Sequence, residues 1–339
     1  FGPGTAECLD MALDMAEGYG FETCDYDGYV GCVDMNELPH QLDILAHLDV
    51  VPAGEGWTVT EPFKPVLKDG KLYGRGTADD KGPAVAALYA MRAVKELGIP
   101  LKKNVRLILG TDEECGSSDI RHYYSIEKEA PMTFSPDAEY PLVNTEKGRF
   151  PGHFTAGFEA SDALPRLVSI KAGTKVNVVP GKAKAAVEGF EMAALEKAAA
   201  ETKEETGISF ELAAEGTVTE ITATGIGAHA STPDVGNNAL TGLLVFLGKL
   251  DFASCPQVDM VRKTASLFPH GDVNGKTLGV AMEDELSGNL TLSFNMLSVD
   301  AASMDGEFDG RIPVCGNDEN VLEVVRARMA EQGLTLLNK

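Results

Sequence analysis

Hydrophobic and polar positions in the first 148 residues follow helical and strand spacings in turn. Leu9, Leu13 and Met15 recur at helical spacing, and Thr5 is a candidate cap for a helix over residues 5–18. Short apolar runs predict strands here, and longer runs rich in Ala and Leu predict helices. In chain order, the further predicted elements are strands Val30–Val33 and Leu42–His47, helix Gly82–Leu97, strand Leu101–Gly110 and helix Ser117–Lys128. This alternation predicts an α/β domain with a mostly parallel sheet and right-handed crossovers.

The pattern changes after residue 148. Residues 217–224 alternate Val, Ile and Ala with Thr and Glu, which is typical of a half-exposed antiparallel strand. The other predicted strands are Lys175–Pro180, Ala183–Gly189, Asn289–Leu297 and Leu334–Leu337, and the predicted helices are Glu191–Glu205, Asn238–Leu250 and Asp318–Gln332. We therefore expect two domains, residues 1–148 and 149–339. The second is predicted to be α+β and built from two similar halves.

Composition narrows the compartment and the partners. The chain has 52 acidic and 29 basic residues among 339, for a formal net charge of −23, so it offers no basic patch for nucleic acid. Its six cysteines are scattered and form no Cys-x-x-Cys pair, which indicates free thiols in a reducing compartment, and we expect a cytoplasmic protein. No signal peptide and no apolar run of membrane-spanning length occur, so we expect no membrane partner.

Acidic clusters follow the predicted strands. His47 and Asp49 end one strand two positions apart, the run 112–114 (Asp-Glu-Glu) directly follows another, and Asp79 and Asp137 lie in loops. A His beside an Asp at a strand end is more often a structural pair than a ligand. However, ligands bind beyond the carboxyl ends of parallel strands, where these clusters would meet. One imidazole among several carboxylates suits zinc, with cobalt and manganese as less selective possibilities.

Four motifs in order resemble those of a known family. They are His47-x-Asp49, Gly74-Arg-Gly-x-x-Asp79-Asp-Lys-Gly82, Asp112-Glu-Glu114 and Ser135-Pro-Asp137-Ala138. Together they are similar to the dinuclear-zinc aminoacylase and carboxypeptidase family, and the Phe-Ser-Pro-Asp-Ala form and large second domain look like PepV-type dipeptidases. The resemblance covers nearly the whole chain. It implies a catalytic domain that carries an inserted lid domain.

The resemblance also implies a ligand set for two zinc ions per full-length subunit. His47 and Asp137 would bind one zinc, Asp79 would bridge the two ions, and Glu114 would bind the second. Asp49 would orient His47, because a ligating His usually donates its other ring N–H to an acceptor. In that family the peptide bond that follows the bridging Asp79 is typically cis.

The remaining functional residues are implied by the same resemblance. Glu113 would be the general base that takes a proton from a metal-bridging water and passes it to the leaving amine. Asn177, His229 and Arg311 would be lid residues that hold the substrate, with Arg311 on its carboxylate. Without the family, each lid residue has a simpler interpretation: a turn asparagine, a plain loop histidine and a surface ion pair.

One expected ligand is missing from the sequence. The family takes its last zinc ligand, a His, from a C-terminal segment that returns to the catalytic domain, whereas His270 is the last histidine before Lys339. We therefore expect an incomplete catalytic domain and a second zinc without its final ligand, with His122 and His153 as the first substitutes to examine. The predicted function is a monomeric zinc dipeptidase acting on short peptides. An N-acyl amino acid amidohydrolase or desuccinylase, or a catalytically inactive truncated form, are the alternatives.

Overall fold

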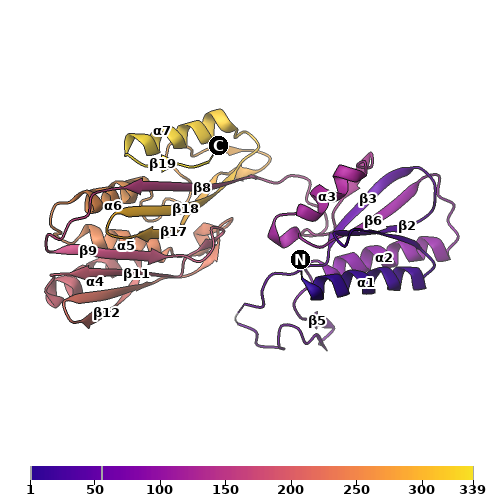
Figure 1. Ribbon diagram of the computed structural model, residues 1–339, viewed down its shortest axis with the longest axis horizontal. Helices are drawn as coiled ribbons and strands as arrows, with labels where there is room; N and C mark the ends of the chain where they lie inside the picture. Colours follow the sequence, from indigo (N-terminus) through magenta and orange to yellow (C-terminus); the bar gives the residue numbers. More distant parts are fainter. Residues whose placement is uncertain (1, 55, 339) are drawn as a thin grey trace. The chain divides into compact units, whose positions relative to one another are not determined.

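The computed structural model describes residues 2–54 and 56–338, which form two compact units (Figure 1). The first unit spans residues 1–143 and the second residues 144–339. The domain boundary predicted at residue 148 instead coincides with the start of β8 (Gly148–Gly157), a strand of the second unit.

A five-stranded sheet forms the centre of the first unit, in the order β1-β2-β6-β3-β7. β3 (His40–His47) runs parallel to β6 (Asn104–Gly110) and to β7 (Met132–Phe134). β2 (Val30–Asp34) is antiparallel to β6 and to β1 (Glu22–Tyr26). The predicted α/β class is confirmed, and the sheet is mixed because an antiparallel hairpin is added at one side.

Two Asp-Gly turns close hairpins that the hydrophobic pattern does not predict. The turn from β1 to β2 begins with Asp27 and Gly28, and Asp69 and Gly70 connect β4 (Val66–Lys68) to β5 (Lys71–Tyr73). All four turn residues have positive φ, between 53° and 74°. Asp and Gly accept this left-handed conformation more readily than most residues, and it matches the twist of hairpin strands.

Helices cover both faces of this sheet (Figure 1). α1 (Pro3–Gly18) and α2 (Lys81–Glu96) pack Leu9 and Leu88 into a cluster with Leu107 of β6. On the opposite face, Tyr123 of α3 (Ser118–Ile126) packs with Ile108, the next residue of the same strand. Successive strand residues point to opposite faces, so this three-layer packing leaves only the strand ends and their loops for chemistry.

A fully antiparallel sheet of eight strands forms the second unit, in the order β12-β13-β11-β9-β17-β18-β8-β19. The strands besides β8 are β9 (Arg166–Ala172), β11 (Lys182–Glu188), β12 (Ser209–Glu215), β13 (Val218–Thr224), β17 (Thr291–Val299), β18 (Ser303–Ile312) and β19 (Thr335–Leu336). The helices are α4 (Met192–Thr206), α5 (Ala239–Gly248), α6 (Pro256–Leu267) and α7 (Glu323–Glu331). A hairpin, a helix and an outer strand follow one another twice, as β9-β11-α4-β12 and β17-β18-α7-β19, which agrees with the expectation of two similar halves.

The predicted helices and most predicted strands of the second unit are present, with shifted ends. β8, β9, β12, β18 and α6 were not predicted. All six cysteines are free, as expected. Within the described part of the chain, no helix is both long and apolar enough to span a membrane.

Candidate metal centre

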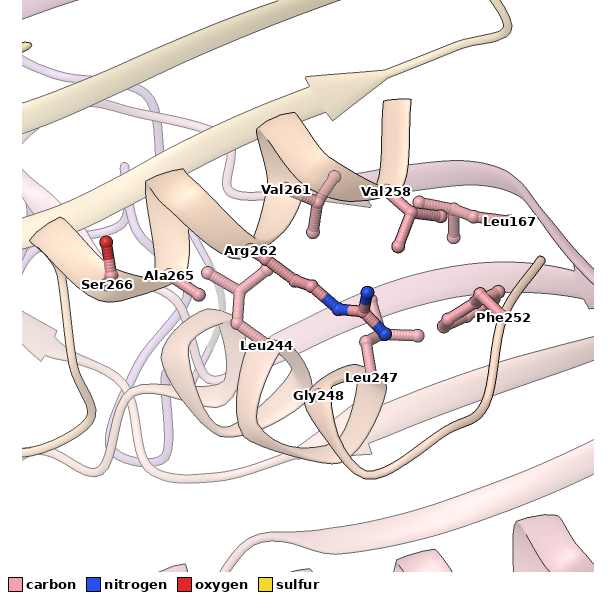
Figure 2. A pocket seen from close by; sticks show the side chains of 10 residues that line it. All are labelled: Leu167, Leu244, Leu247, Gly248, Phe252, Val258, Val261, Arg262, Ala265 and Ser266. Atoms are coloured by element: carbon pink, nitrogen blue, oxygen red, sulfur yellow. The ribbon is translucent and has the colours of Figure 1, made fainter. Parts of the chain in front are cut away.

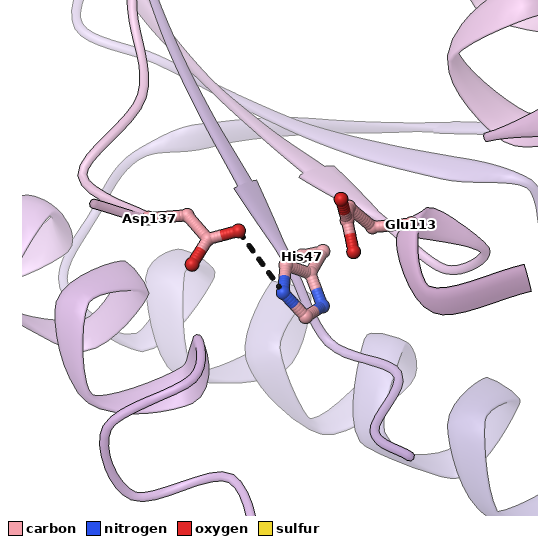
Figure 3. A group of neighbouring side chains, drawn as sticks. All are labelled: His47, Glu113 and Asp137. Carbon is pink, nitrogen blue, oxygen red and sulfur yellow. Dashed lines mark ion pairs between the residues drawn. The ribbon is translucent and has the colours of Figure 1, made fainter. Parts of the chain in front are cut away.

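His47 ends β3 with its ring buried, only 3% of the residue being exposed. Its Nδ1 donates to the Asp49 backbone carbonyl at 3.2 Å and lies 3.3 Å from Asp49 Oδ1. Nε2 is thereby left to face the Asp79 carboxylate at 3.0 Å. It also lies 3.4 Å from the Asp137 carboxylate, and Figure 3 marks this second pair. Ligand atoms around one zinc, at bonds of about 2.0–2.2 Å, stand at similar distances from one another.

The Glu113-Glu114 pair joins this cluster from the loop after β6. Glu113 offers a carboxylate oxygen that lies within 4.8 Å of ligand atoms of His47 and Asp137, and Figure 3 shows it on the far side of the ring from Asp137. Glu114 stands within the same distance of ligand atoms of His47 and Asp79. The structure therefore brings together all five residues expected to bind the metals or act as base, in two groups that share His47.

Asp49 does more than orient the imidazole. Its Oδ1 accepts the backbone N–H of Glu113 at 3.2 Å, and its Oδ2 accepts that of Glu114 at 3.0 Å. Burial raises the pKa of Asp49, but the hydrogen bonds from His47 and from these two amides outweigh it and lower the pKa below its usual value. Asp49 thus ties the ligand His47 to the loop that carries the candidate base, a role that sequence reasoning missed.

Asp80 is a second residue that sequence reasoning missed. It is fully buried, and its Oδ2 accepts the backbone N–H of His47 at 3.1 Å. The peptide bond between Asp79 and Asp80 is cis, as the family resemblance implied. Burial is the main cause that raises the pKa of Asp80, to about 6. Asp80 therefore holds the main chain of the strand end from which the imidazole projects.

The charges of the cluster favour a cation. Burial lowers the pKa of His47, but the hydrogen bond and charge of Asp49, with the charges of Asp137 and Glu113, raise it to about 9. Burial, followed by neighbouring carboxylates, raises the pKa values of Glu113, Glu114 and Asp137, while the charge of His47 partly lowers them. A divalent cation would relieve this crowding of carboxylates, and the oxygen and nitrogen donors fit zinc, cobalt or manganese.

The three predicted substrate residues lie in the second unit. Asn177 precedes β10 (Val178–Val179), and its carbonyl accepts the N–H of Ala230 at 2.9 Å. β10 pairs with β14 (Ala228–His229), so Asn177 and His229 are close neighbours. The ring of His229 is exposed, and its Nδ1 lies 2.6 Å from the Ser231 hydroxyl and accepts the Ser231 backbone N–H at 3.3 Å. Nδ1 is therefore an acceptor, which places the ring proton on Nε2 as an outward donor.

Arg311 is held by an ion pair inside its own unit. Its Nε and Nη2 donate to the two oxygens of Asp309 at 2.8 and 3.1 Å, and Asp309 is fully buried. Arg311 pairs across the sheet with Thr291, whose hydroxyl donates to the Ser231 carbonyl at 3.5 Å, so its strand adjoins the His229 loop. Two of the guanidinium nitrogens thus serve the fold, in an ion pair with a buried acid rather than the surface ion pair of the simpler interpretation.

The substitute histidines have other partners. His122 pairs with Asp27 at 3.0 Å, and His153 pairs with Asp305 at 2.9 Å. Neither belongs to the two ligand groups around His47 among residues 2–54 and 56–338. His153 forms a separate His-and-carboxylate group with Asp305 and Glu307 on the second unit.

An apolar pocket of about 320 Å³ lies between α5 and α6 of the second unit, with Arg262 extending over it (Figure 2). Its lining residues are Leu167, Leu244, Leu247, Gly248, Phe252, Val258, Val261, Arg262, Ala265 and Ser266. None of the predicted site residues is among them, so the candidate chemistry stays with the His47 cluster.

Comparison with known proteins shows the family to which this chain belongs. Residues 44–337 match the family described as Peptidase family M20/M25/M40, and the chain belongs to that family, which confirms the membership predicted from its motifs. A protein of Bacillus subtilis (strain 168) named "Putative dipeptidase YtjP" is 37% identical over 88% of this chain. The "Beta-Ala-Xaa dipeptidase" of Lactobacillus delbrueckii subsp. lactis is 38% identical over 89%.

The matches cover unequal shares of the proteins compared. This chain spans 64% of the length of each of those two relatives. Among solved structures, the aminoacylhistidine dipeptidase of Vibrio alginolyticus is 12% identical, with a TM-score of 0.47 and coverage of 97% of this chain and 73% of that one.

Proposed function

We propose that this protein hydrolyses dipeptides with the help of divalent metal ions bound at the His47 cluster. The observation that supports this most directly is the position of His47 Nε2, 3.0 Å from a carboxylate oxygen of Asp79 and 3.4 Å from one of Asp137, with Glu113 and Glu114 alongside. The two relatives named as dipeptidases, each at least 37% identical, support the same substrate class.

The proposed ligand roles are those that the family resemblance implies, and the closeness of these side chains supports them. His47, Asp79 and Asp137 would hold one cation, and Asp79 and Glu114 would contribute to holding a second. Divalent cations at such a site act as Lewis acids and lower the pKa of the hydrolytic water. Zinc is the proposed ion, with cobalt or manganese able to replace it.

Glu113 is the proposed general base. Burial raises its pKa toward the working range, which suits a group that must take a proton from water and return it to the leaving amine. The Asp49 carboxylate holds the Glu113 main chain, so the base keeps its place when its charge changes.

The second unit is proposed to bind the peptide. His229 would donate from Nε2 to the substrate carbonyl, because Ser231 occupies its Nδ1. Asn177 would contact the substrate beside it, and the remaining nitrogen of Arg311 would bind the free carboxylate. We further propose a cytoplasmic monomer, and light scattering at micromolar concentration tests the monomer, which a dimer would contradict.

A matched screen with metal analysis tests the proposal. The protein is stripped with a chelator, reloaded with zinc, cobalt or manganese, and assayed on α- and β-alanyl dipeptides and on N-acetyl and N-succinyl amino acids. We expect metal-dependent cleavage of dipeptides and no cleavage of the acylated amino acids. Hydrolysis restricted to the acylated compounds would replace the proposal with an amidohydrolase, and cleavage that persists in the stripped protein would refute the metal role.

A further inference from the structure

The turn that follows β6 donates four consecutive backbone N–H groups to two buried carboxylates. Thr111 and Asp112 donate to Asp119 Oδ2 at 2.6 and 3.0 Å. The next two residues, Glu113 and Glu114, donate to Asp49. Hydrogen bonds to an ionised acceptor are roughly twice as strong as neutral ones, so this stretch of main chain is fixed from both ends.

Asp119 can reach these amides only because residue 110 is a glycine. Asp119 is fully buried in the first turn of α3, and a Cβ on Gly110 would stand 2.5 Å from its Oδ2. That distance is far inside van der Waals contact. The other oxygen of Asp119 accepts the Ile120 N–H at 2.7 Å, which leaves the carboxylate little freedom to move aside.

The same turn is also tied in the opposite direction. The Asp112 carboxylate accepts the N–H and the hydroxyl of Ser118 at 3.0 and 2.5 Å, and the Asp112 carbonyl accepts the Ser117 N–H at 2.7 Å. The start of α3 and the turn after β6 therefore hold each other. A displacement of Asp119 must be passed along the main chain to Glu113 and Glu114.

We infer that Asp119, seated on Gly110, is a positioning residue for the Glu113-Glu114 pair. The inference rests on the proposed function for the roles of that pair, as base and metal ligand. Asp119 itself touches neither of the two glutamate side chains in any contact described above. It acts through the backbone of Thr111 and Asp112, and Asp49 completes the support from the metal side.

Two variants of the 339-residue chain, Asp119→Asn and Gly110→Ala, test the inference by hydrogen exchange of the segment 111–116. The first variant replaces the charged acceptor with a neutral amide, and the second displaces the carboxylate by contact. We expect exchange at the Glu113 and Glu114 amides to become at least about 10-fold faster in both, although those amides bond Asp49 rather than the changed residue. Unchanged exchange at these two amides in either variant would overturn the inference.

Cobalt titration adds a readout that a purely structural role would not move. We expect Co²⁺ affinity about 10–100-fold weaker in both variants, as is typical when an outer partner of a metal ligand is lost, with an altered visible spectrum. Wild-type cobalt binding and spectrum in the variants would also overturn it. If the unaltered chain binds no cobalt, the proposed metal centre fails, and the exchange measurement still decides the positioning role.

Asp43→Asn is the matched control. Asp43 is also fully buried in the first unit, and it accepts a single backbone N–H, from Ala130 at 3.1 Å, away from the turn. We expect this change at another fully buried aspartate to leave exchange at Glu113 and Glu114 as it is in the wild type. If Asp43→Asn speeds exchange there as much as Asp119→Asn, the effect is general destabilisation and the inference is wrong.

Discussion

The two units differ in what they bury. Among the described residues, the first unit buries His47 and five aspartates, which are Asp43, Asp49, Asp80, Asp112 and Asp119. Among the described residues of the second unit, Asp309 is the single buried acidic or basic side chain, and the other buried polar side chains there are Thr, Ser, Asn and Gln. Burying several like charges lowers the free energy of unfolding, so the candidate site makes the first unit less stable than an apolar interior would.

The second unit is stabilised in the ordinary way. A single large apolar cluster runs beneath its sheet. Within it, the ring of Phe268 contacts those of Phe154, Phe294 and Phe308, and Phe154 also contacts Phe294. The apolar residues of the first unit are split into two smaller clusters on opposite faces of the sheet. The comparison teaches that chemistry and core packing are separated in this chain, and the following predictions test that separation.

Glu113→Gln should have the largest effect, and on activity alone. Loss of a general base typically costs 10²–10⁴ in rate, and glutamine keeps the shape and the backbone bond to Asp49. We expect dipeptide turnover to fall by that factor while metal content and thermal stability stay close to wild type. Initial rates and metal analysis on the same sample measure both quantities.

The matched variant Glu114→Gln should lose metal as well as activity, because Glu114 is a proposed ligand. If Glu113→Gln hydrolyses dipeptides at near the wild-type rate, Glu113 is not the base. If instead it loses metal as Glu114→Gln does, the roles of the two glutamates are exchanged.

Phe294→Ala should have the opposite effect to Glu113→Gln, because it should lower stability and leave metal binding unchanged. Phe294 is 2% exposed and stacks on Phe268 at 4.4 Å between ring centroids. Removing a buried phenyl ring of this kind costs about 3–5 kcal/mol of the free energy of unfolding. Urea denaturation measures the loss, and cobalt titration of the folded variant should be unchanged. A change in cobalt affinity at 25 °C would show that the two units are coupled.

Arg311→Met separates the structural role of Arg311 from its proposed role in substrate binding. The structural partner of Arg311 is Asp309, a buried acid of the second unit. The change leaves Asp309 buried, with Arg149 at 3.7 Å as its remaining basic partner, and should cost roughly 3 kcal/mol. Adding Asp309→Leu removes the stranded charge and should restore most of the stability. The double variant should still bind dipeptides weakly, as a raised KM. Full recovery of KM would show that Arg311 has no substrate role.

Sequence reasoning recovered the parts of the fold that have long apolar runs. β3, β6 and α2 follow such runs, and the convergence of the acidic motifs followed because neighbouring parallel strands end at one edge. Sequence reasoning failed where glycines interrupt the alternation of apolar and polar residues along a strand. Phe154 lies opposite Gly306, and Phe308 opposite Gly152, so each ring fills the space above a glycine. A pattern that counts glycine as a strand breaker misses β8 and β18 for this reason.

The supporting aspartates were not predictable in the same way. Asp80 and Asp119 stand among 52 acidic residues, and nothing local distinguishes an acid that binds buried amides from one on the surface. Their role depends on which backbone N–H groups the tertiary structure brings to them. Gly110 gives no signal either, because its requirement comes from a side chain nine residues later.

Asp34 should give the smallest effect and the clearest sign. It bonds Arg106 through both oxygens at 2.9 and 2.8 Å, with Asn104 and His40 as further donors, remote from the residues of the metal cluster. Burial raises the pKa of Asp34, but these hydrogen bonds outweigh it and lower the pKa below its usual value of 3.8.

A carboxyl whose pKa is lower in the folded state stabilises the protein above its unfolded pKa. That stability is lost as the pH falls through the folded value. Wild type should therefore be more stable than Asp34→Asn near pH 6, and the gap in urea midpoint should narrow as the pH falls below 3.8. A gap that stays constant over this range would mean that the negative charge of Asp34, and therefore its ion pair with Arg106, does not stabilise the first unit.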